Sequence, residues 1–141
     1  MRYFNTEGTC SPREHYMVQL DDRLACIKNT LVDRRKYFVI NRGRQYGKTT
    51  TLAALEEYLK DDYTVLSLDF QQMGTEDFAD AATFAHAFAA ILIETLEING
   101  LGDREELMAP LAEVMDRDHN SLKDLFIRLS RMCRNSRQPI V

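Results

Sequence analysis

The chain contains Gly43-Arg44-Gln45-Tyr46-Gly47-Lys48-Thr49-Thr50 between a short apolar run and a stretch with helical periodicity. Gly47 has no side chain, so consecutive backbone N–H groups can turn inward around an anion. Lys48 can reach the β- and γ-phosphates of a nucleotide, and the Thr49 hydroxyl can bind Mg²⁺. A helix that begins here adds its N-terminal amides and the positive end of its dipole. The stretch therefore predicts a phosphate-binding loop.

The spacing departs at one position from the GxxxxGK[ST] pattern, because the first glycine of that pattern falls on Arg42 and Gly43 lies one residue later. The alternative is a coincidental GKT at a helix start, and the flanking sequence argues against it. Lys36-Tyr37-Phe38-Val39-Ile40 has the aromatic and β-branched content of a buried parallel strand. Helical spacing follows the loop, at Leu52, Leu55, Tyr58 and Leu59. We predict a strand, a phosphate loop and a helix, in that order.

Composition limits the class of protein. With 141 residues, of which 45% are hydrophobic and 28% charged, the chain has the profile of a soluble globular domain. The net charge of -4 gives no general attraction to nucleic acid. The three cysteines lack the spacing of a zinc site or a disulfide framework, which favours a reducing, cytoplasmic compartment. No signal peptide is recognisable, and the longest apolar run, 84–93, is too short for a membrane span.

The order of elements predicts the fold class. Residues 1–20 are expected to form an N-terminal arm, and 21–141 the N-terminal part of a single domain. A helix capped by Asp21 or Asp22 precedes the first strand, and a second strand is expected at 63–70. Three helices are expected after it, at 78–98, 104–117 and 122–135. This order favours an α/β fold, a three-layer sandwich with a parallel sheet and right-handed crossovers.

A third strand is expected to begin at Gln138-Pro139-Ile140-Val141. In a P-loop NTPase an acidic strand end holds the Mg²⁺ ion. We therefore expect the sequence to stop before the Walker B acids. Asp69, at the end of the second strand, is the alternative metal-binding acid, and Arg44 is either a phosphate ligand or a solvated loop residue.

Three segments together resemble the N-terminal P-loop domain of bacterial AAA-like, STAND-related ATPases with an ORC/AAA-type core. They are YFNTEGTCSPREHYMV at 3–18, YFVINRGRQYGKTTTLAALEEYL at 37–59 and VLSLDF at 65–70. The resemblance implies that arginine is normal at the first glycine position, which reduces the difficulty over Arg42. It also implies that Tyr16, Met17 and Val18 pack near adenine, although they could equally anchor the arm to the core.

The expected function is ATP binding, with Mg²⁺-dependent hydrolysis as the motor or switch of a larger protein. Lys48 would hold the γ-phosphate and Thr49 the metal, and Thr50 with the backbone of 44–47 would hold the α- and β-phosphates. The resemblance implies partners in the C-terminal remainder of the same chain, and by analogy a protein or nucleic acid. Two alternatives stay open, namely a regulatory module that binds nucleotide without hydrolysis and a P-loop kinase of a small metabolite.

Overall fold

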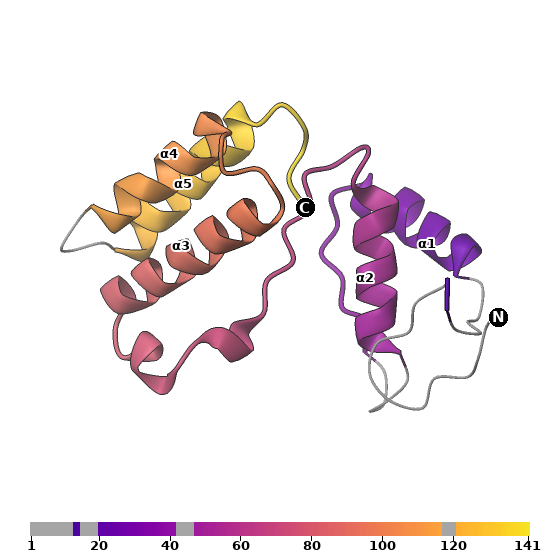
Figure 1. Ribbon diagram of the computed structural model, residues 1–141, viewed down its shortest axis with the longest axis horizontal. Helices are drawn as coiled ribbons and strands as arrows, with labels where there is room; N and C mark the ends of the chain where they lie inside the picture. The colour runs from indigo at the N-terminus through magenta and orange to yellow at the C-terminus, as the bar shows by residue number, and fades with distance from the viewer. Residues whose placement is uncertain (1–12, 15–19, 42–46, 117–120) are drawn as a thin grey trace. The chain divides into compact units, whose positions relative to one another are not determined.

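The computed structural model describes residues 13–14, 20–41, 47–116 and 121–141. The chain divides into two compact units, Met1–Asp61 and Asp62–Val141. Figure 1 shows helices α1 and α2 in the first unit and helices α3, α4 and α5 in the second. Each unit is described separately below. The predicted boundary at residue 20, between an arm and the rest of the chain, stays a prediction.

The first unit contains two packed helices. Helix α1, Asp21–Ile27, continues into a π-helical turn, η1, at Lys28–Val32. The N-cap of α1 is Leu20, and not Asp21 or Asp22 as predicted. Both aspartates lie in the first turn, where a negative charge is stabilised by the positive end of the helix dipole. Helix α2, Lys48–Leu59, packs against α1 and buries Thr51, Leu55 and Leu59. The helix predicted after the loop is therefore confirmed.

The second unit is built on three helices: α3, Ala81–Ile98, α4, Glu105–Met115, and α5, Leu122–Asn135. Two short 3₁₀ turns, η2 at Phe70–Gln72 and η3 at Thr75–Phe78, precede α3. All three helices contact one another. Their inward faces form the core, which contains Ala85, Ala89, Leu92, Leu96, Leu107, Leu111, Val114, Leu125 and Met132. Burial of this apolar surface is the main stabilising contribution in this unit.

Local signals in the sequence explain where these helices begin and end. Asp80 caps α3 by accepting hydrogen bonds from the amides of Ala82 and Thr83, at 2.8 and 2.9 Å. Ser121 and Asp124 form a capping box at the start of α5. Beyond the end of α3, Gly100 has φ +70°, a left-handed conformation that glycine adopts without strain. The three predicted helices are confirmed, with the bounds of 78–98 and 104–117 shortened to those of α3 and α4.

The predicted α/β sandwich with a parallel sheet is wrong for the part of the chain that the structure describes. Within it no β-strand forms, and the regular structure is helical. The expected first strand at 36–40 has no regular structure, and its Tyr37 and Val39 side chains are 103% and 88% exposed. Aromatic and β-branched residues favour a strand only where a neighbouring strand and a packed face are available. The second unit instead buries its apolar residues among three helices.

A single parallel bridge joins two of the segments that were expected to be strands. Thr64 pairs with Ile140. The amide of Thr64 donates to the carbonyl of Pro139 at 2.9 Å, and the amide of Val141 donates to the carbonyl of Thr64 at 3.0 Å. The amide of Leu66 also donates to the carbonyl of Val141, at 2.9 Å, and the carbonyl of Val65 accepts from the Asn99 side chain at 3.4 Å. The chain then turns into η2 at Phe70.

Among the described residues, α3 is the one helix with the length and apolar composition to cross a membrane. The apolar run counted in the sequence, 84–93, is shorter than the helix that contains it. The buried face of α3 packs in the core of the second unit, and a core helix of a soluble protein passes the same test. This finding is therefore weak evidence for a membrane span.

The cap at the start of α3 predicts a specific dependence of stability on pH. Hydrogen bonds from the Thr83 backbone, then from the Thr83 side chain and the Ala82 amide, lower the pKa of Asp80 below its ordinary value of 3.8. A carboxyl with a lowered pKa stabilises the fold above its unfolded-state pKa, and that contribution is lost as the pH falls through the folded-state pKa. Asp80→Asn retains a capping side chain and cannot titrate. We expect the urea midpoint of Asp80→Asn to fall less than that of the wild type when the pH is lowered from neutral to acid. Equal decreases of the two midpoints would contradict the stabilising role of the Asp80 carboxylate.

Candidate functional site

The start of α2 carries the part of the predicted phosphate loop that the structure describes. Gly47 is the N-cap residue, with φ 70° and ψ 30°, and Lys48, Thr49 and Thr50 form the first turn of the helix. Gly47, Lys48 and Thr49 are exposed, and Thr50 is half-buried. The remaining predicted ligands lie outside the described residues, namely Arg42, Gly43, Arg44, Gln45, Tyr46, Tyr16, Met17 and Val18.

Glycine is required at residue 47 by the backbone and not by crowding. A Cβ atom built on Gly47 would meet nothing within 4 Å, so a side chain would have room. The φ of +70° lies in the left-handed region, where a residue with a Cβ is strained by roughly 1–2 kcal/mol. Among the described residues, the space beside this glycine is therefore open.

A residue that the sequence pattern does not single out, Thr51, fixes the orientation of this turn. Its amide and its Oγ1 both donate to the carbonyl of Gly47, at 2.9 and 2.8 Å. Thr51 is buried, and the hydrogen bond of its hydroxyl is partly buried. Because the Gly47 carbonyl is directed along the helix, the amides of the first turn are directed toward the N-terminal end. The sequence indicates this role of Thr51 only through the run Thr49-Thr50-Thr51. The GK[ST] pattern ends at Thr49 and does not include Thr51.

The electrostatics of this helix end favour an anion. The N-cap of α2 makes no side-chain capping hydrogen bond, and no acidic residue lies in the first turn. The N-cap residues of α1 and α4 also lack such a bond, whereas Asp80 caps α3 and Ser121 caps α5. Lys48 adds a positive charge to the positive end of the α2 dipole, an arrangement that is unfavourable for helix stability and suited to a bound anion. The described end of α2 thus combines a left-handed glycine, a lysine and a threonine at the start of an uncapped helix.

The structure does not test the role of Asp69 as a metal ligand, because Asp69 lies in the second unit. There its carboxylate accepts from the amide of Gln71 at 2.9 Å and caps η2. Within the described ranges, no group of three or more His, Cys, Asp or Glu side chains is arranged to hold a metal ion. Thr49 is therefore the described residue on which the Mg²⁺ prediction rests.

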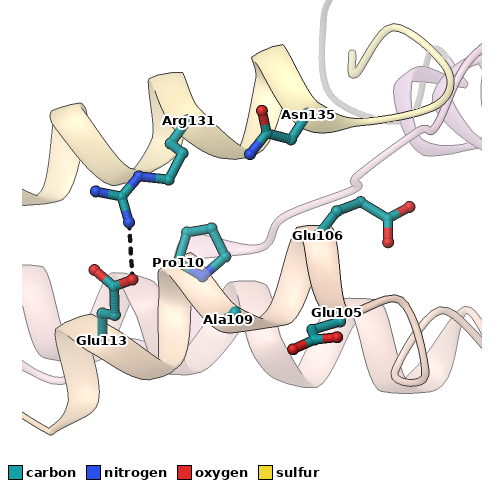
Figure 2. Close-up of a pocket in the computed structure, with 7 residues that line it drawn as sticks. All are labelled: Glu105, Glu106, Ala109, Pro110, Glu113, Arg131 and Asn135. Carbon is teal, nitrogen blue, oxygen red and sulfur yellow. Dashed lines mark hydrogen bonds and ion pairs between the residues drawn. The ribbon is translucent and has the colours of Figure 1, made fainter.

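The second unit has an open groove of about 380 Å³ lined by residues of α4 and α5. Figure 2 shows the side chains that line it. Its lining residues are Glu105, Glu106, Ala109, Pro110, Glu113, Arg131 and Asn135. Glu113 forms an ion pair with Arg131 at 2.8 Å and with the buried Arg128 at 3.4 Å, and Glu106 pairs with Arg104 at 3.0 Å. The Glu113 ion pairs join α4 to α5, and the Glu106 ion pair lies at the start of α4. We therefore interpret the groove as part of the packing interface between α4 and α5, and not as a ligand site.

Comparisons of the chain with protein-family models, with curated proteins and with solved structures found no match. The resemblance to AAA-like ATPases therefore stays a prediction from the residues at 3–18, 37–59 and 65–70. The functional argument rests on the geometry at the start of α2.

Proposed function

We propose that this chain binds ATP with Mg²⁺ at the N-terminal end of α2. The observation that carries the proposal is the left-handed Gly47 directly before Lys48 and Thr49, at an exposed helix start without a side-chain cap. Phosphate groups bind at such helix starts because unpaired amides and the dipole act on the same anion. Neither contribution requires a parallel sheet, so the proposal does not depend on the fold class that was expected.

Each residue of the first turn has a distinct part in the proposed complex. The Lys48 ammonium group would contact the β- and γ-phosphate oxygens as a point charge. The amides of Thr49 and Thr50 precede the first intrahelical hydrogen bond, from the Thr51 amide to the Gly47 carbonyl, and would donate to the phosphates. The Thr49 hydroxyl would bind Mg²⁺, which neutralises part of the phosphate charge.

The proposal is one of binding. The first turn of α2 contains no acidic residue, so hydrolysis would need a carboxylate from elsewhere to hold the metal and orient a water molecule. A module that holds nucleotide as a switch needs only the groups named above. No observation on the described residues favours a kinase of a small metabolite.

Substitution of Gly47 tests the proposal against a matched control. Gly47 and Gly100 both have φ +70° and open space for a Cβ. Gly47→Ala and Gly100→Ala should therefore each lower the free energy of unfolding by about 1 kcal/mol. We expect Gly47→Ala alone to weaken ATP binding, by about tenfold, because the first-turn amides turn away from the phosphates.

The measurement is calorimetric titration of the full chain with ATP in the presence of Mg²⁺, together with urea unfolding of both variants. Equal ATP affinities for the two variants would contradict the proposal. A wild-type protein that binds no ATP at millimolar concentration would do the same.

A further inference from the structure

Four phenylalanine rings form a continuous row on the second unit. Phe78 packs on Phe84 with ring centroids 5.8 Å apart, Phe84 stacks on Phe88 at 5.7 Å, and Phe88 stacks on Phe70 at 5.9 Å. The two end rings belong to η3 and η2, and the two middle rings lie on the first half of α3. Phe70 and Phe78 are 52% and 56% exposed. Aromatic side chains ordered by stacking and left open to solvent are typical of contact surfaces.

The segment of the sequence that carries this row, between Lys60 and Arg104, is acidic. Residues 61–103 contain no Lys or Arg, and their nine carboxylates are Asp61, Asp62, Asp69, Glu76, Asp77, Asp80, Glu94, Glu97 and Asp103. Asp69 directly precedes Phe70, and Glu76 and Asp77 directly precede Phe78. Asp80 caps the helix that carries the two middle rings. Both ends of the aromatic row therefore carry exposed negative charge.

Three of these carboxylates, those of Asp69, Asp77 and Asp80, accept hydrogen bonds from backbone amides. Asp69 accepts from the Gln71 amide at 2.9 Å, Asp77 from the Gly74 amide at 2.8 Å, and Asp80 from the amides of Ala82 and Thr83. A hydrogen bond from a neutral amide leaves the full negative charge on the acceptor. The surface is thus preorganised and has no positive partner from its own segment.

The exposed aromatic rings and the carboxylates at both ends of the row limit the kind of partner that can bind there. Nucleic acid would be repelled by the negative ends of the row. Lys and Arg side chains are attracted both to carboxylates and to the faces of aromatic rings, by about 0.5–2 kcal/mol for each ring contact. Apolar side chains between the cations would cover the remaining ring surface. Charge complementarity therefore points to a segment that is both basic and apolar.

We propose that the aromatic row Phe70–Phe88–Phe84–Phe78 binds a basic, apolar peptide segment of another protein. Apolar side chains of that segment cover the exposed edges of Phe70 and Phe78, and its Lys or Arg residues pair with the carboxylates at the two ends of the row. The end rings supply most of the contact area because they are the most exposed members. The flanking charges select against neutral or acidic segments.

The probe is a short fluorescein-labelled peptide of repeated Lys-Leu-Phe triplets, titrated with the full chain and followed by fluorescence anisotropy. Its control is the same peptide with Gln in place of Lys. We expect the Lys peptide to bind and the Gln peptide to bind at least tenfold more weakly. Phe78→Ser should weaken binding of the Lys peptide by about tenfold. Phe126→Ser, which removes a ring that is 60% exposed on α5, should change it less than twofold.

Two double variants, each of which removes two carboxylates, test the proposal if Phe78→Ser does not fold. Glu76→Gln with Asp80→Asn preserves size and capping at the row, and Glu94→Gln with Glu97→Gln makes the same change in net charge further along α3. We expect the first double variant alone to weaken binding. Equal effects of the two double variants, equal binding of the two peptides, or equal effects of Phe78→Ser and Phe126→Ser would overturn the proposal. So would a wild-type protein that self-associates through the row, as shown by a molar mass that falls on Phe78→Ser.

Discussion

Leu107→Ala is expected to lower the free energy of unfolding of the second unit by about 3 kcal/mol. Leu107 is fully buried, at 0% exposure, in the core that α3, α4 and α5 share. Truncation removes its transfer free energy and leaves a cavity that three packed helices cannot close completely. Urea unfolding followed by circular dichroism measures the change, since most of the helical signal of this unit is lost in the same transition.

The matched control for that substitution is Leu122→Ala, which removes the same atoms from the start of α5. Leu122 is an exposed residue, so we expect a loss below about 1 kcal/mol. If the two variants lose the same stability, the helical core described for the second unit is wrong. A loss for Leu107→Ala below 1 kcal/mol would lead to the same conclusion.

Lys48→Ala is expected to weaken ATP affinity by about 10- to 100-fold. A hydrogen bond to a charged group contributes about 1.5–3 kcal/mol, and the Lys48 ammonium group is the one side-chain cation that the described first turn of α2 offers to a polyphosphate. Calorimetric titration with ATP and Mg²⁺ gives the affinity, and urea unfolding without nucleotide gives the stability.

Lys60→Ala is the control for this charge change. Lys60 follows the last residue of α2, is exposed, and pairs with Glu57. Its removal changes the net charge of the protein equally but at the opposite end of the helix, so we expect less than a twofold change in ATP affinity. If Lys48→Ala binds ATP as tightly as the wild type does, or if Lys60→Ala loses as much affinity as Lys48→Ala, the phosphate site is not at the start of α2.

The helices could be predicted because their determinants are local. In α5, a Ser-x-x-Asp capping box precedes apolar residues at helical spacing, and the observed bounds, Leu122–Asn135, agree with the prediction. In α3, the Ala-rich sequence and the Asn99-Gly100 stop specify a helix without help from distant residues. The predicted start at residue 78 is three residues early, because Phe78 ends the separate 3₁₀ turn at Thr75–Phe78 and Asp80 caps the helix.

The predicted sheet is wrong for the described residues, because strand formation depends on distant partners. Tyr37-Phe38-Val39 has strand-like composition, yet nothing in those residues specifies a neighbour to pair with, and the segment is exposed in the structure. Thr64 and Ile140 lie far apart in the sequence and do pair, but only as an isolated bridge. The element order used to infer a parallel sheet therefore rested on partners that the sequence does not specify.

In the candidate site, too, the local features could be predicted from the sequence and the features that depend on the folded structure could not. Gly47, Lys48 and Thr49 could be identified because a glycine before a helix start and the residues that follow it are local features. The role of Thr51 depends on which carbonyl its hydroxyl reaches in the folded helix, which the pattern does not encode. The adenine contacts expected at Tyr16, Met17 and Val18, like the loop residues 42–46, lie outside the described residues and stay predictions.

The most direct test of the phosphate site is an amide NMR spectrum of the full chain recorded during titration with ATP and Mg²⁺. The proposal predicts that the amide resonances of Gly47, Lys48, Thr49 and Thr50 shift most, because these groups would donate to phosphate oxygens. The amides of Glu56, Glu57 and Lys60, toward the opposite end of α2, should shift little. Saturating ATP that leaves the first-turn amides unchanged would contradict the central claim.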